Sequence, residues 1–254
     1  GSSEGPSGAV ASMMRPASVV ASQAELETRL KTYVAMGQKG DKRNASFLRI
    51  AWRSEKDPAV RAAIADALIL SDPKEPAHVR IFLDSAVASD EVFGRLQKAA
   101  KKAGLDVPVL SSLVELASSG QVEAVARLFE FVRFTASDEM GAAFLAEQLA
   151  VVAHDAPVEL LSALRSSSEA DRSAALDGLV TGLVKQSQAD APLWAAIKTS
   201  QGSVDPSVAS FSKSLEVLLS QRIAEAKAPK AEPSVVPAEP TAAPGPAVPT
   251  APGG

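Results

Sequence analysis

The chain contains no cysteine, which excludes disulfides, thiolate catalysis and cysteine-ligated metal sites. It has only two histidines, His78 and His154, which lie far apart in the sequence and do not form the HExxH pattern of a zinc-binding helix. No run of about 18 apolar residues occurs, so the sequence predicts no transmembrane segment.

Sequence motifs of common enzymes are missing as well. There is no GxSxG nucleophile elbow, no P-loop and no GxGxxG dinucleotide fingerprint. Paired carboxylates such as Asp138 and Glu139 fit the first turn of a helix, where negative charge is favourable. We therefore expect a protein without enzymatic activity, with no catalytic residues, no bound metal and no cofactor.

Nucleic-acid binding has little support from the composition. The formal net charge is −4, which gives no overall attraction to nucleic acid or to anionic membranes. Aromatic residues make up only 4% of the chain, and no aromatic platform for stacking bases is recognisable.

Alanine and leucine supply much of the apolar fraction of 46%. Both are strong helix formers, and no alternating strand pattern bounded by turns is found, so we predict an all-α protein. Residues 1–21 are small and polar and begin with Gly1-Ser2, typical of a tag remnant, while eight prolines follow Lys227. We predict a disordered leader (1–21), a helical domain (22–226) and a disordered Ala/Pro-rich tail (227–254). The composition is typical of a GC-rich bacterial source.

Four aspartates, each with a valine three positions later and a proline nearby, recur at nearly equal intervals. The steps between them are 49, 49 and 50 residues, and the set is Asp57, Asp106, Asp155 and Asp205. A fixed period of this length is typical of repeat architectures. Asp57 is expected to cap a helix that begins at Pro58, where the missing N–H of proline costs nothing.

Two further sets of helix-start residues keep this spacing, namely Ser22, Ser71, Ser119 and Ser168, and Asp41, Asp90, Asp138 and Asp190. Three sets in register predict three units of about 49 residues with three helices each, preceded by helices at about 23–37 and 42–54 and followed by one at about 206–226. The predicted fold is a right-handed α-solenoid-like array. The alternative is an irregular helical domain in which the spacing arises by chance.

The segment 57–68, with the sequence DPAVRAAIADAL, resembles the second-helix signature of HEAT repeats in its D-P-x-V-R start and small apolar continuation. The other units keep the aspartate and the valine but have Leu110, Glu159 and Ala209 in place of the arginine. A three-helix unit is more similar to armadillo repeats than to two-helix HEAT repeats. The resemblance to HEAT/armadillo-like α-solenoids implies a scaffold that binds other macromolecules along a groove, and it implies no chemistry.

Basic residues are concentrated in the first part of the chain. Arg49 and Arg53 are four residues apart and share a helix face, and Lys98 and Lys102 repeat this pair 49 residues later. If the units stack, the four side chains form a basic stripe across two neighbouring helices. Such a stripe could bind an acidic protein or the phosphates of a nucleic acid, or it could be an ordinary solvated face.

Phe131 and Phe134 share one stripe of a helix, and Phe129 lies on another. This helix is therefore either the most buried one of the array or the carrier of an exposed docking patch. The candidate partner-binding residues are Arg49, Arg53, Lys98, Lys102, Phe131 and Phe134.

These features lead us to expect a non-enzymatic protein-interaction scaffold or adaptor, with a protein partner and a cytoplasmic location. The second hypothesis is a phosphate- or nucleic-acid-binding helical repeat protein that uses the basic stripe. The third is an exported adaptor, periplasmic or tethered to a membrane by an anchor outside this sequence.

Overall fold

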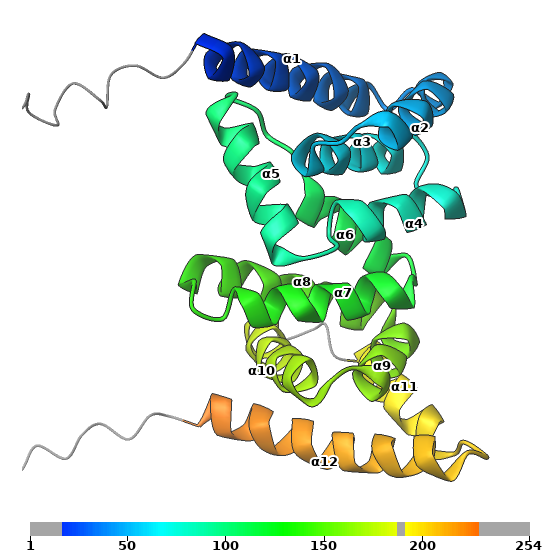
Figure 1. Ribbon diagram of the computed structural model, residues 1–254. Coiled ribbons are helices and arrows are strands. Elements are labelled where there is room, and N and C mark those ends of the chain that lie inside the picture. Colours follow the sequence, from blue (N-terminus) through cyan, green and yellow to red (C-terminus); the bar gives the residue numbers. More distant parts are fainter. Residues whose placement is uncertain (1–16, 187–190, 229–254) are drawn as a thin grey trace, which may run out of the picture.

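The computed structural model describes residues 17–186 and 191–228, and within these residues it contains twelve α-helices and no β-strand. The prediction of an all-α protein is thereby confirmed. Figure 1 shows the helices in successive layers, from α1 at one end of the molecule to α12 at the other. Asp190 and nearly all of the predicted leader and tail lie outside the described residues.

The first half of the chain forms α1 (Ala17–Lys39), a 3-10 turn η1 (Lys42–Asn44), α2 (Ala45–Ser54), α3 (Pro58–Ser71), α4 (Pro76–Ser85), α5 (Asp90–Lys102) and α6 (Val109–Ser118). The second half forms α7 (Val122–Phe134), α8 (Glu139–Asp155), α9 (Pro157–Ser166), α10 (Glu169–Lys185), α11 (Ala191–Gln201) and α12 (Pro206–Lys227).

Side-chain caps explain several helix starts. Asp57 and Asp205 accept hydrogen bonds from backbone N–H groups at the starts of α3 and α12, and a proline occupies the first helical position after each. The Ser168 hydroxyl caps α10 in the same way. The predicted cap at Asp57 is confirmed, and helices begin next to Ser168 and Asp205 as the spacing predicted.

Other expected starts are displaced. Ser71 is the last residue of α3, and α4 begins instead at Pro76. Asp155 is the last residue of α8, and α9 begins at the proline two residues later. Proline determines these starts because its fixed φ suits the first turn of a helix and no later one. Asp106 and Ser119 likewise flank α6 without starting a helix.

One hydrophobic core runs through the described residues, from Leu30 of α1 to Leu219 of α12. In its N-terminal part α3 is central, because it packs against α1, α2, α4, α5 and α6 and is buried on nearly every side. Its alanine-rich sequence suits this position, since small side chains let several helices approach at once.

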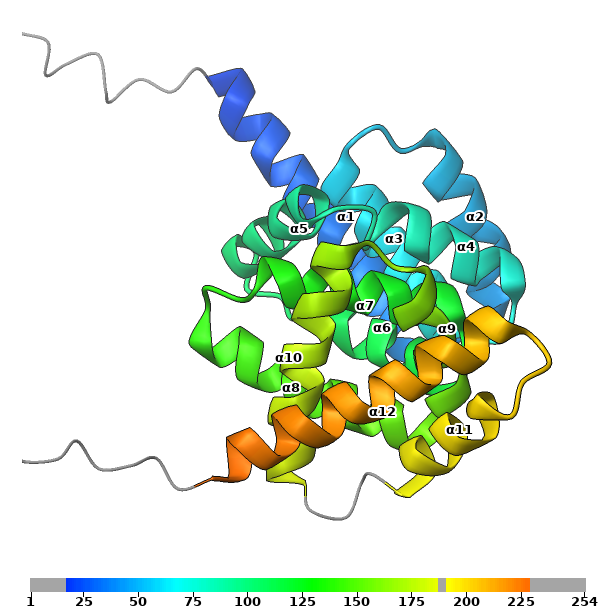
Figure 2. The same ribbon diagram turned by 90° about the horizontal axis from the view of Figure 1, so that it is seen from below.

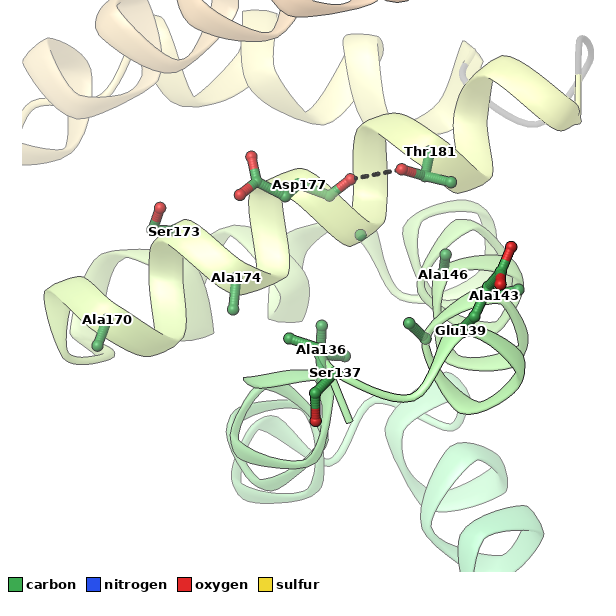
Figure 3. A pocket seen from close by; sticks show the side chains of 13 residues that line it. Ala136, Ser137, Glu139, Ala143, Ala146, Ala170, Ser173, Ala174, Asp177 and Thr181 are labelled. Atoms are coloured by element: carbon green, nitrogen blue, oxygen red, sulfur yellow. Dashed lines mark hydrogen bonds between the residues drawn. The ribbon is translucent and has the colours of Figure 1, made fainter. Parts of the chain in front are cut away.

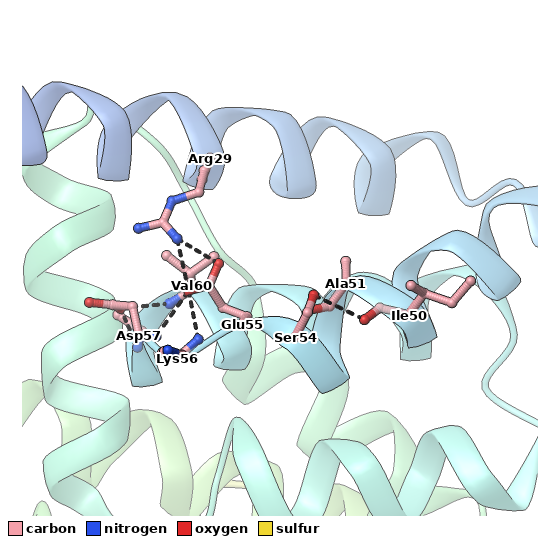
Figure 4. A network of polar contacts seen from close by, with 9 residues as sticks. Arg29, Ile50, Ala51, Ser54, Glu55, Lys56, Asp57 and Val60 are labelled. Carbon is pink, nitrogen blue, oxygen red and sulfur yellow. Dashed lines mark hydrogen bonds and ion pairs between the residues drawn. The ribbon is translucent and has the colours of Figure 1, made fainter.

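A polar network fixes α1 to the turn between α2 and α3 (Figure 4). The Arg29 guanidinium donates hydrogen bonds of 2.8 Å to both carboxylate oxygens of Glu55. The same carboxylate accepts hydrogen bonds of 2.9 Å from the backbone N–H groups of Lys56 and Asp57. Only 7% of the Glu55 side chain is exposed, so its charge depends on these partners and little on water.

Candidate functional site

A hollow of about 800 Å³ lies between α8, α10 and the end of α7 (Figure 3), and we name it the α8–α10 groove. Ala174 of α10 points toward Ala136, which lies in the turn between α7 and α8. Small side chains make up most of its walls, which consist of Val132, Ala136, Ser137, Glu139, Ala142, Ala143, Ala146, Ala170, Ser173, Ala174, Asp177, Gly178 and Thr181.

The close approach of α8 and α10 explains why the groove exists. Gly182 of α10 lies against the backbone of α8, and a Cβ at this position would clash with the carbonyl oxygen of Ala146. Away from this contact, residues such as Ala143 and Ala174 are too small to fill the space between the helices. A pair of helices that touch at a glycine therefore leaves an open channel beside the contact.

The groove has an apolar floor and a polar rim. Val132 is buried beneath it, and Gly178 leaves no room for a side chain, because a Cβ there would lie 3.0 Å from Leu149 Cδ1. The charged residues in the walls, Glu139 and Asp177, are both acidic. Asp177 pairs with Arg222 of α12, whereas Glu139 forms no ion pair within the described part of the chain.

This arrangement suits the binding of a chain segment. A shallow channel with small apolar walls can accept the apolar face of a helix or an extended peptide. An acidic rim adds attraction for lysine or arginine side chains flanking that face.

The four residues of the expected basic stripe do not come together. Arg49 and Arg53 lie on α2, Lys98 and Lys102 lie on α5, and α3 packs against both helices. Figures 1 and 2 both show α2 and α5 on different sides of the molecule. The two basic pairs therefore lie on helices that α3 separates, and they do not form a continuous track for phosphates.

The two candidate phenylalanines of α7, Phe131 and Phe134, have different environments. Phe131 is 2% exposed and meets Phe93 of α5 edge-to-face, with ring centroids 5.1 Å apart. Phe134 is 36% exposed, and the Arg133 guanidinium lies 4.7 Å from its ring centroid. Phe131 therefore belongs to the core, and Phe134 alone is accessible to a partner.

Two titratable side chains are buried away from the groove. Asp66 of α3 is 2% exposed and accepts a hydrogen bond of 2.8 Å from the Ser112 hydroxyl of α6. Burial raises the pKa of Asp66 from 3.8 to about 6, although the hydrogen bond from Ser112 works in the opposite direction. His78 is equally buried, and its Nδ1 lies 3.2 Å from the Asp72 carbonyl oxygen.

The α8–α10 groove was missed by sequence reasoning, although α10 carries a signal for it. Small residues recur at every fourth position in Ala170, Ala174, Gly178 and Gly182. Positions four apart share a helix face, so this pattern indicates a face that either touches another helix closely or leaves a channel. The pattern does not distinguish a close helix contact from a channel, because the outcome depends on the side chains of α7 and α8.

Within 17–186 and 191–228, no cluster of three or more histidine, aspartate and glutamate side chains is arranged to hold a metal ion. None of the helices in these ranges combines the length and the apolar character needed to cross a membrane.

Comparison with known proteins identifies no relative. A scan against protein-family models gave no match, and searches of curated proteins and of solved structures gave none either.

Proposed function

We propose that the chain is a non-enzymatic protein-interaction scaffold built on a HEAT-like helical repeat, and that the α8–α10 groove holds a segment of its partner. The observation that carries this proposal is the groove itself, an open channel of about 800 Å³ with small apolar walls and an acidic rim. Helix-in-groove recognition uses a channel of this kind.

Recurrent packing supports an array of three-helix units. The first helix of each proposed unit packs against the second in the pairs α3–α4, α6–α7 and α9–α10. It also packs against the third in the pairs α3–α5, α6–α8 and α9–α11. Second helices of successive units meet as well, in the pairs α4–α7 and α7–α10. This recurrence is what an α-solenoid with a period of about 49 residues would give.

The two end helices also fit an array. Thr28 and Thr32 lie on the exposed face of α1, and Ser210, Lys213 and Ser214 lie on that of α12, where Val217 is the one large apolar side chain exposed. Terminal repeats need such polar outer faces because no further unit covers them.

The chemistry of the groove indicates what the partner presents. A helix with small or medium apolar side chains on one face would fill the channel, and lysine or arginine beside that face would meet Glu139. We therefore expect a basic amphipathic segment of another protein.

A pair of groove substitutions tests the proposal. Ala170→Arg and Ser173→Arg change two exposed residues of the groove wall, so they should block the channel and repel a basic segment without disturbing the core. The control carries Thr32→Arg and Ala35→Arg, which add the same charge on the exposed face of α1. A protein retained from source lysate by the unmodified chain is identified by mass spectrometry, purified and titrated against all three forms.

We expect the groove variant to bind this partner about tenfold more weakly or worse, and the control to bind within about twofold of the unmodified chain. Equal affinity of all three forms, or retention of nucleic acid and no protein, would contradict the proposal.

A further inference from the structure

Helix α2 exposes two large apolar side chains. Phe47 is 51% exposed and Ile50 is 66% exposed, and they lie three residues apart on the outward face of the helix. The ring of Tyr33 on α1 lies 6.5 Å from that of Phe47, which extends the apolar surface toward α1. Exposed apolar groups next to each other cost solubility unless something covers them.

The same outward face carries positive charge. Arg53 is exposed and Arg49 is partly exposed, and neither forms an ion pair within residues 17–186 and 191–228. By helical spacing the two arginines lie on one side of Ile50, and Phe47 lies on the other. We name the set of Phe47, Arg49, Ile50 and Arg53 the α2 corner.

Three carboxylates near the α2 corner are already in ion pairs, and a fourth, Asp57, caps the start of α3. Asp41 accepts from Arg43, Asp72 pairs with Lys42, and Glu55 is held by Arg29. Because these carboxylates already have partners, the positive charges of Arg49 and Arg53 are not neutralised nearby. The corner is therefore positive although the net charge of the whole chain is −4.

The position of α2 limits what can cover it. Figures 1 and 2 show α2 at the outer edge of the molecule, and Phe47 and Ile50 are its exposed large apolar side chains. A partner helix needs a groove to lie in, whereas a lipid surface can deform around projecting apolar groups. Phenylalanine and isoleucine partition into the boundary between headgroups and acyl chains, and neighbouring arginines attract anionic headgroups.

We propose that the α2 corner is a docking surface for anionic lipid bilayers. Ile50 and Phe47 enter the interface, and Arg49 and Arg53 contact the headgroup phosphates. Because the rest of the chain carries net negative charge, orientations that turn this corner toward the bilayer are favoured.

Vesicle co-sedimentation of the full chain tests this proposal. One set of vesicles contains equal parts of phosphatidylcholine and phosphatidylglycerol, and the other contains phosphatidylcholine alone. We expect binding to the anionic vesicles, little binding to the neutral ones, and a clear loss between about 50 mM and about 500 mM salt as charges are screened.

Matched substitutions locate the surface. Ile50→Asp removes the central apolar group, and Val217→Asp makes the same charge change at a side chain of nearly equal exposure, 67%, on α12. Arg53→Glu reverses the charge of an exposed residue and leaves the apolar pair intact. We expect Ile50→Asp and Arg53→Glu each to weaken binding to anionic vesicles about fivefold or more, and Val217→Asp to have little effect.

Absence of binding to the anionic vesicles overturns the proposal, and this is also the result if the corner binds an acidic protein segment instead. Equal loss in Ile50→Asp and Val217→Asp overturns it too, because the effect would then come from the added charge and not from the corner. Circular dichroism of every variant confirms that the helices are retained.

Discussion

Replacing Asp66 by asparagine is expected to stabilise the protein at neutral pH. Asp66 is a carboxylic acid in the middle of the most buried helix, and its one hydrogen-bond partner among the described residues is Ser112. An ionised carboxylate with a single hydrogen bond is poorly compensated for its lost water. Asparagine has nearly the same shape, still accepts from the Ser112 hydroxyl and never ionises.

The expected gain follows from the raised pKa. Burial moves the pKa of Asp66 from 3.8 to about 6 in the folded state. Below pH 3.8 the group is protonated whether the chain is folded or unfolded, and no penalty exists. Between pH 3.8 and about 6 the unfolded chain ionises first, so stability falls as pH rises. Above pH 6 the penalty is constant at roughly 3 kcal/mol, since one pKa unit corresponds to about 1.4 kcal/mol.

Asparagine does not recover all of this energy. Its amide N–H₂ group needs acceptors that the buried site was not built to supply, which costs about 1 kcal/mol. We therefore expect Asp66→Asn to raise the free energy of unfolding by about 1–3 kcal/mol at pH 7.5 and to lower it slightly at pH 4.

Urea unfolding at a series of pH values measures the effect as a difference between variant and unmodified chain. The difference is needed because other carboxylates change the stability of the protein with pH in the opposite direction. A hydrogen bond from Arg43 lowers the pKa of Asp41, and one from Ser207 lowers that of Asp205. Their contribution to stability is lost as pH falls, but it is common to both forms and cancels.

A surface substitution separates burial from net charge. Asp84→Asn makes the same change in net charge at a side chain that is 61% exposed, so its effect should be small. A stability difference for Asp66→Asn that stays constant from pH 4 to pH 7.5 would refute the reasoning. So would a gain at pH 7.5 that Asp84→Asn reproduces.

Three further predictions concern stability, and urea unfolding checks each. Glu55→Gln should lower the free energy of unfolding by roughly 3 kcal/mol, because Arg29 loses its charged partner. Glu91→Gln, at an exposed ion pair, should lower it by well under 1 kcal/mol. Similar losses in the two variants would show that burial of the pair is unimportant. Gly182→Ala should destabilise the protein by about 2 kcal/mol or more, because the added methyl group would clash with α8. Gly94→Ala, with open space around it, should stabilise the protein by up to about 1 kcal/mol. A stabilising effect of Gly182→Ala would be incompatible with the close contact between α8 and α10. Asp57→Ala should cost about 1 kcal/mol by removing the cap of α3, and no loss would mean that Pro58 alone sets this helix start.

The sequence alone predicts structural features that depend on residues close together in the chain. Alanine and leucine content predicted the helices, the Asp-Pro pairs at Asp57 and Asp205 accompanied two predicted helix starts, and the cap at Asp57 was predicted as well. Both features act within one turn of helix, so no tertiary contact is needed to see them. The displaced start near Ser71 shows the limit, since a competing proline five residues on determines where α4 begins.

The candidate site depends on contacts between distant segments, and the sequence alone could not supply them. Arg49 and Lys98 have equivalent positions in the 49-residue spacing, yet α3 lies between their helices. Phe131 and Phe134 are three residues apart, yet Phe93 of α5 covers only the first of them. In each case a helix from elsewhere in the chain decides which side chains lie together or reach the surface.

The two proposed binding surfaces should act independently. The α2 corner lies near α1 at one end of the layers, and the α8–α10 groove lies toward α12 (Figure 1). Substitutions at distant sites without shared contacts usually have additive effects. Ile50→Asp should therefore leave the affinity for the groove partner unchanged, and the Ala170→Arg and Ser173→Arg pair should leave vesicle binding unchanged. A protein that holds its partner in one layer and a bilayer at another would bring the two together. Loss of both activities in either variant would point to a general loss of structure and would remove the support for two separate surfaces.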